Sequence, residues 1–123
     1  MAKTIEVAGT VKYENTAGIG AILGPSLVKS ITVLEQQSME STLATAGTLT
    51  ISFAAVVNAK ILVIKVSAGP VTVTVTVNAV ASGNIRVNDL FMLVDTGGGI
   101  TAAAVTQSTG SDVTVETFIA GST

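Results

Sequence analysis

The sequence predicts an all-β fold, an antiparallel β-sandwich or barrel of about eight short strands. Val and Thr are the dominant side chains, and β-branched residues favour the pleated surface of a sheet. Val and Thr alternate along residues 71–77, which predicts valines facing a core and threonines facing outward. Turn residues recur at short spacing, as in Ser67-Ala68-Gly69-Pro70 and Thr96-Gly97-Gly98-Gly99. The best helix candidate, residues 36–45, predicts one turn at most.

Each expected strand is a short segment rich in β-branched and apolar residues between turn signals. The eight expected strands span residues 5–13, 27–35, 48–53, 60–67, 71–77, 90–94, 100–106 and 112–119. Glu14-Asn15-Thr16 and the glycines beyond it interrupt this pattern, so residues 1–25 are a candidate N-terminal arm. No linker or internal repeat is visible, and we expect one domain over residues 1–123.

The composition predicts an apolar surface that needs a cover. Only 11% of the residues are charged, whereas soluble domains average roughly 25%. Mean hydropathy is +0.68, yet no stretch approaches the roughly 18 apolar residues of a membrane helix. We therefore expect neighbouring protein copies, rather than lipid, to cover the excess apolar surface.

Two of the expected strands are apolar on both faces, Ile61-Leu62-Val63-Ile64 and Leu90-Phe91-Met92-Leu93-Val94. An antiparallel sandwich normally exposes one polar face of each strand to solvent. A strand without a polar face is either central under a covering loop or part of an interface. Both interpretations remain open from the sequence.

Several function classes are disfavoured by the residues that are missing. The chain has no Cys and no His, which removes thiolate nucleophiles, imidazole bases and most zinc or haem ligands. The net charge is −2 and Lys and Arg do not cluster, so nucleic acid binding is not expected. The acids show no calcium-loop pattern. We expect no cofactor, no metal and no membrane partner, and synthesis in the cytoplasm because an N-terminal signal segment is lacking.

The segment Leu93-Val94-Asp95-Thr96-Gly97 resembles the active-site signature of aspartic proteases, in which paired carboxylates share one proton. The resemblance covers five residues only. That family places the triplet early in its fold, whereas fewer than thirty residues follow Asp95 here, and Gly98 replaces the expected Ala or Ser. We therefore predict a turn at Asp95 and a non-enzymatic protein.

The glycine-rich segment Gly18-Ile19-Gly20-Ala21-Ile22-Leu23-Gly24-Pro25 is a candidate contact element. It lacks the Gly-Lys-Ser/Thr ending of a phosphate loop and contains no cation. We expect a flexible apolar loop or arm, packed against its own subunit or against a neighbour. Ile19, Ile22 and Leu23 supply its apolar contacts and are the candidate interface residues.

The C-terminal half of the chain resembles small jelly-roll structural proteins of tailed bacteriophage virions, especially capsid decoration (cement) proteins. The resemblance implies a jelly-roll sandwich on the capsid surface, bound to the major capsid protein and to copies of itself, with a trimer favoured. It also implies that the N-terminal arm bridges capsid subunits. The residues that carry it are Ile61-Leu62-Val63-Ile64-Lys65, Gly69-Pro70-Val71-Thr72-Val73, Leu90-Phe91-Met92-Leu93, Asp112-Val113-Thr114-Val115 and Ile119-Ala120-Gly121.

Two other classes fit the same pattern. A tail or fibre-attachment structural protein would have the same sequence features. A carbohydrate-binding jelly-roll module is disfavoured because such modules stack aromatic rings on sugars, and this chain has no Trp. Its aromatic residues are Tyr13, Phe53, Phe91 and Phe118, and the three phenylalanines are expected in the core.

Overall fold

The computed structural model describes residues 3–15, 18–54, 56–107 and 110–122, with the side chains of residues 7–30 outside the description. The described residues form eleven strands and no helix, which confirms the all-β prediction. The chain divides into two compact units, Met1–Thr32 and Val33–Thr123.

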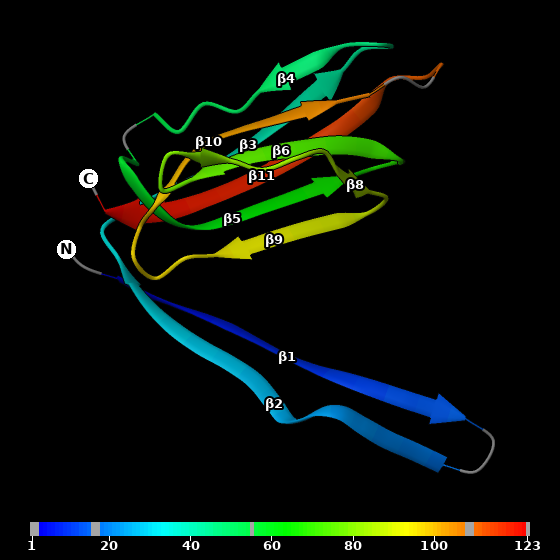
Figure 1. Cartoon of the computed structure of the whole chain (residues 1–123), viewed down its shortest axis with the longest axis vertical. Coiled ribbons are helices and arrows are strands. Elements are labelled where there is room, and N and C mark those ends of the chain that lie inside the picture. The colour runs from blue at the N-terminus through cyan, green and yellow to red at the C-terminus, as the bar shows by residue number, and fades with distance from the viewer. Residues whose placement is uncertain (1–2, 16–17, 55, 108–109, 123) are drawn as a thin grey trace. The chain divides into compact units, whose positions relative to one another are not determined.

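The first unit is built from two long strands, β1 (Lys3–Asn15) and β2 (Gly18–Val33), which form a two-stranded sheet. The strands run in opposite directions, so we call this unit the hairpin (Figure 1). The expectation of a flexible loop at residues 18–25 is wrong, because the backbone of this segment belongs to β2. Pairing with β1 supplies hydrogen-bond partners to backbone groups that a loop would leave to water.

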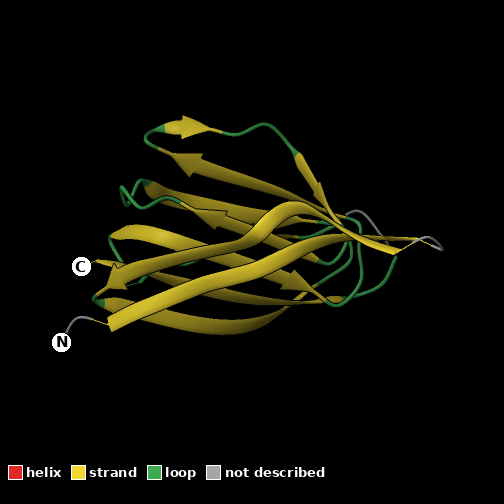
Figure 2. Ribbon diagram, turned by 90° about the horizontal axis from the view of Figure 1, so that it is seen from below, coloured by secondary structure: helices red, strands yellow, loops and turns green. Residues whose placement is uncertain are grey.

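The second unit is an antiparallel β-sandwich whose two layers are visible in Figures 1 and 2. We name the layers after their central strands, the β5 sheet and the β6 sheet. Among the described residues, a bridge between Ile100 and Ala59 connects them. In hydrogen-bonding order the β5 sheet contains β3 (Glu35–Leu43), β11 (Val113–Ser122), β5 (Asn58–Val66) and β9 (Leu90–Val94). The β6 sheet contains, in the same kind of order, β4 (Thr48–Thr50), β10 (Ile100–Thr106) and β6 (Val71–Val77). Two short strands, β7 (Val80–Ala81) and β8 (Ile85–Val87), both pair with β6.

The strand pairing has a regular order when β7 and β8 are counted as one interrupted strand. The first strand of the sandwich then pairs with the eighth, β3 with β11, and the second with the seventh, β4 with β10. The third pairs with the sixth, β5 with β9, and the fourth with the fifth, β6 with β8. This order is compatible with the jelly roll that the sequence predicts.

The core lies between the two sheets and is aliphatic. In β6 the predicted alternation is confirmed, since Val71, Val73 and Val75 are at most 6% exposed while the threonines between them are half-buried. Facing them, Leu62 and Ile64 of β5 are fully buried. Burial of one such side chain stabilises the fold by roughly 1.5–3 kcal/mol, so this two-sided core is the main source of stability.

The strand β3 occupies most of residues 36–45, where the sequence predicted one helical turn at most. It pairs with β11 over nine residues, from Leu43 opposite Val113 to Glu35 opposite Gly121. Leu43 belongs to the core and Met39 packs against it. Their spacing of four residues suits a helix face, but it also places both side chains on one face of a strand.

Candidate assembly surface

The outward face of the β5 sheet is a ladder of residues in register across four strands. Met92 of β9 lies opposite Val63 of β5, and Val63 lies opposite Phe118 of β11. Phe118 in turn lies opposite Ser38 of β3. The neighbouring residues Leu62 and Leu93 pack in the core or against it, so the pleat directs this row away from the core.

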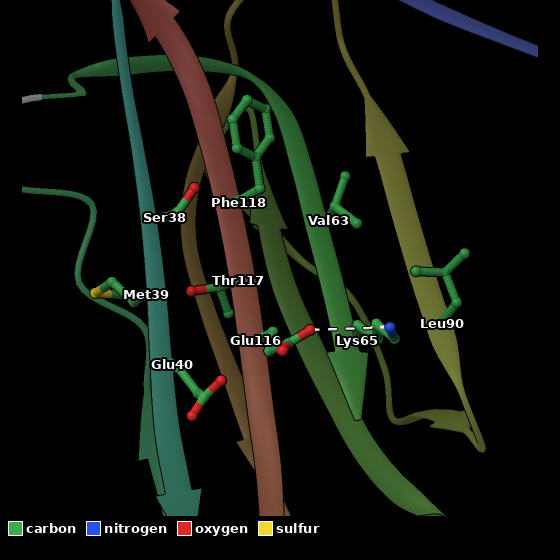
Figure 3. A pocket seen from close by; sticks show the side chains of 9 residues that line it. All are labelled: Ser38, Met39, Glu40, Val63, Lys65, Leu90, Glu116, Thr117 and Phe118. Atoms are coloured by element: carbon green, nitrogen blue, oxygen red, sulfur yellow. Dashed lines mark ion pairs between the residues drawn. The ribbon is translucent and has the colours of Figure 1, made fainter. Parts of the chain in front are cut away.

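The next row carries the charges of this face. Leu90 lies opposite Lys65, Lys65 opposite Glu116, and Glu116 opposite Glu40. The face is therefore apolar along β9 and acidic toward β3. The side chains of these two rows are drawn in Figure 3, apart from that of Met92.

A shallow groove of about 530 Å³ lies on this face. Its apolar lining includes Val63, Leu90 and Phe118, and its polar lining includes Glu40 and Glu116 (Figure 3). We call it the outer groove. Leu90 in this lining is 56% exposed, and Met92 on the same strand is 48% exposed. Large apolar side chains gathered on one exposed strand are typical of a binding surface.

The strand β9 is also an edge of the β5 sheet. Among the described strands it pairs with β5 alone. Proteins usually protect such edges with Lys, Pro, a bulge or a covering segment, because an open edge recruits other strands. All five residues of β9 are apolar. This edge therefore lacks a protective side chain of its own and favours a cover from outside.

The charges of the outer groove are incompletely balanced. Lys65 Nζ lies 4.0 Å from Glu116 Oε2, with side chains 69% and 51% exposed. An exposed pair of this kind contributes about 1 kcal/mol at most. Glu40 lies on the other side of Glu116, and like charges opposite each other on adjacent strands are unfavourable. One more cation at this point would stabilise the row.

The two doubly apolar strands have different explanations. β5 is central, between β11 and β9, and its Ile61, Leu62 and Ile64 are at most 1% exposed. β9 is the edge strand with exposed apolar residues. The burial of β5 therefore fits the interpretation of a central strand, and β9 remains a candidate interface strand.

Asp95 lies in the turn that follows β9, as the sequence predicts. Its Oδ1 accepts a hydrogen bond from the Gly97 N–H at 3.0 Å, and its Oδ2 accepts one from the Gly99 N–H at 3.0 Å. Gly98 has a φ of 74°, a conformation that glycine adopts without strain. Both oxygens of the carboxylate are thus used to close its own loop.

Ile19, Ile22 and Leu23 are the predicted interface residues. The structure places their backbone in β2, and their side chains lie outside the described residues. The outer groove was only partly visible in the sequence. Phe118 was expected in the core, but it is half-buried and lines the groove. The alternation of β11 contains the signal, since Val115, Thr117 and Ile119 are buried at every second position, which places Phe118 on the opposite, outward face of the strand.

In the part of the chain that the structure describes, no three His, Cys, Asp or Glu side chains gather in a way that would hold a metal ion. No helix in those residues is long and apolar enough to cross a membrane. Compared with known proteins, the sequence matches no protein-family model and no curated protein.

Proposed function

We propose that the protein is a non-enzymatic virion structural protein, a capsid decoration (cement) protein that binds the major capsid lattice and stabilises it through oligomeric contacts. The observation that carries this proposal is the exposed apolar edge of the β5 sheet, Leu90 and Met92 beside Val63 and Phe118. A soluble monomer would gain nothing from keeping these side chains in water, whereas an assembly would bury them.

The fold is consistent with this role. The strand pairing is compatible with a jelly roll, an architecture found in viral capsid proteins and also in lectins. A fold alone does not define a function, so the proposal is based on the outward face of the β5 sheet. The low charge content adds support, because a net charge of −2 produces little repulsion between copies packed closely on a shell.

Binding to a symmetric shell makes weak contacts sufficient. Each copy would contact a major capsid subunit and other copies, most simply as a trimer at a local three-fold position. Once one contact forms, the others become intramolecular and the total affinity rises by orders of magnitude. The protein would be synthesised in the host cytoplasm and act at the capsid surface.

The test is co-sedimentation of the purified protein with expanded empty capsids of the parent virus. We expect saturable binding by the unmodified chain, and loss of binding by Met92→Lys. Val80→Lys is the matched control, because Val80 is also an exposed apolar residue, 70% exposed, but lies on β7 of the other sheet. Binding to tails or fibres instead of capsids would replace the capsid proposal with the tail or fibre-attachment alternative.

Carbohydrate binding is a second candidate, favoured by one observation. Phe118 lines the outer groove together with Ser38 and Glu40, an aromatic and polar combination that suits a sugar (Figure 3). Titration of the protein with mono- and oligosaccharides tests it. Saturable binding that is lost in Phe118→Ala, and kept in Val80→Lys, would favour this function over assembly.

A further inference from the structure

We propose that the outer groove of one copy is occupied by the β1–β2 hairpin of a second copy. This inference rests on the proposed function, because it assigns a partner to the surface that carries the assembly proposal. The partner copy would then contribute apolar side chains that cover the apolar lining of the groove and a cation for its acidic row.

The hairpin needs a partner for its own stability. In the sheet topology β1 pairs with β2, and neither strand joins the nine-stranded sheet. An isolated two-stranded sheet is at best marginally stable in water and requires further packing. Its sequence offers many side chains for such packing. The aliphatic residues Ile5, Val7, Val11, Ile19, Ile22 and Leu23 all belong to β1 and β2.

The two units have charges of opposite sign. Residues 1–32 contain three lysines and two glutamates, which gives +1. Residues 33–123 contain three cations and six carboxylates, which gives −3, and together these make the net −2 of the chain. Association of a hairpin with a sandwich therefore brings opposite charges together.

The charge of the hairpin fits the row at the outer groove. Glu40 and Glu116 lie opposite each other, and the cation of this row, Lys65, pairs with Glu116. The hairpin carries Lys3, Lys12 and Lys29. A lysine from the hairpin would relieve the repulsion between the two glutamates, while aliphatic residues of the same strand cover Leu90 and Met92.

The connection between the hairpin and the sandwich favours a second copy over the chain's own hairpin. Only Leu34 separates the end of β2 at Val33 from the start of β3 at Glu35. Short connections of this kind favour exchange of an element between copies, because they restrict its packing within one chain.

Site-specific crosslinking tests the proposal, and the chain has no cysteine that would interfere. Two full-length variants, Ile22→Cys and Met92→Cys, are refolded together and treated with a bismaleimide crosslinker. We expect a crosslinked dimer that contains one copy of each variant. The matched control replaces Met92→Cys with Val80→Cys, on the other sheet, and should give no such dimer. Circular dichroism checks that each variant is folded.

Three results would overturn the proposal. The first is a dimer formed by Met92→Cys alone, with no crosslink to Ile22→Cys, because it would identify edge-to-edge pairing of β9. The second comes from a double variant with both Ile22→Cys and Met92→Cys: a crosslink that closes within this single chain, with none between the two single variants, would mean that the chain's own hairpin occupies the groove. The third is no crosslink at all in a protein that is oligomeric and binds capsids, and in that case the proposed function survives while this inference fails.

Charge reversal provides an independent measurement. We expect Glu40→Lys to weaken self-association about tenfold, because an attraction of the usual size for an exposed pair becomes a repulsion. Asp112→Lys makes the same change of charge at an exposed position before β11 and should leave self-association unchanged. Equal effects of the two variants would indicate a general charge effect and contradict a lysine at the groove.

Discussion

Met92 on β9 lies directly opposite Val63 on β5, on the face of the β5 sheet that points away from the core, and Met92 is 48% exposed. An apolar cross-strand pair usually contributes through shared burial. Here about half of the Met92 side chain remains in contact with water at a sheet edge. The pair therefore reaches full apolar burial only when a further segment covers Met92.

The first prediction concerns Met92→Lys. The substitution should weaken self-association by about 2 kcal/mol or more, because it removes apolar burial at the interface and places a charge there. The melting temperature of the isolated chain should change little, since Met92 does not belong to the buried core. Analytical ultracentrifugation and thermal unfolding measure the two effects. Val80→Lys serves as the control and should alter neither one.

The second prediction concerns Gln107, which is 2% exposed. Its Nε2 donates to the carbonyl oxygens of Leu43 and Ala44 at 2.8 Å and of Ser111 at 2.9 Å. Gln107→Leu should destabilise the fold by about 2–3 kcal/mol, because buried acceptors would lose their donor. Urea unfolding measures this loss. Gln36→Leu, at an exposed position of β3, should change the free energy of unfolding by less than about 0.5 kcal/mol.

The third prediction concerns Asp95→Asn. We expect assembly to be unchanged, with a loss of stability of about 1 kcal/mol, because the amide cannot accept the hydrogen bonds of both Gly97 and Gly99. Thermal unfolding, sedimentation and a peptidase assay on a general protein substrate measure these properties. A peptidase activity that is present in the unmodified chain and abolished by Asp95→Asn would contradict the non-enzymatic proposal.

The fourth prediction concerns the hairpin. Substitution of Ile19, Ile22 and Leu23 by Ser should reduce self-association and capsid binding strongly, since full burial of each side chain at an interface contributes roughly 1.5–3 kcal/mol before ordering costs. The sandwich should still melt cooperatively, because its core lies in residues 33–123. Collapse of the whole domain in calorimetry would mean that these residues belong to its core.

The strands with strong local patterns were predictable from the sequence. The Val/Thr alternation of β6 and the apolar β9 and β10 have the predicted bounds, residues 71–77, 90–94 and 100–106. Each has β-branched or apolar residues on at least one continuous face and turn residues at its ends. In such segments local propensity and tertiary packing favour the same structure.

Other elements depend on partners that a local pattern does not reveal. The polar segment of β3 is a strand because β11 pairs with it over its whole length. Gly18 to Gly24 becomes part of β2 through pairing with β1. The outer groove combines residues of four strands that are distant in sequence, such as Ser38, Val63, Leu90 and Phe118. The apolar character of β9 was visible in the sequence, but its position at a sheet edge follows only from the strand order.

The most direct test of the assembly proposal is sedimentation equilibrium of the unmodified full-length protein at micromolar concentration. We predict a stable oligomer, with a trimer favoured, in which hydrogen exchange protects the backbone of β9. A well-folded monomer at this concentration, with an unprotected β9, would contradict assembly through the outward face of the β5 sheet.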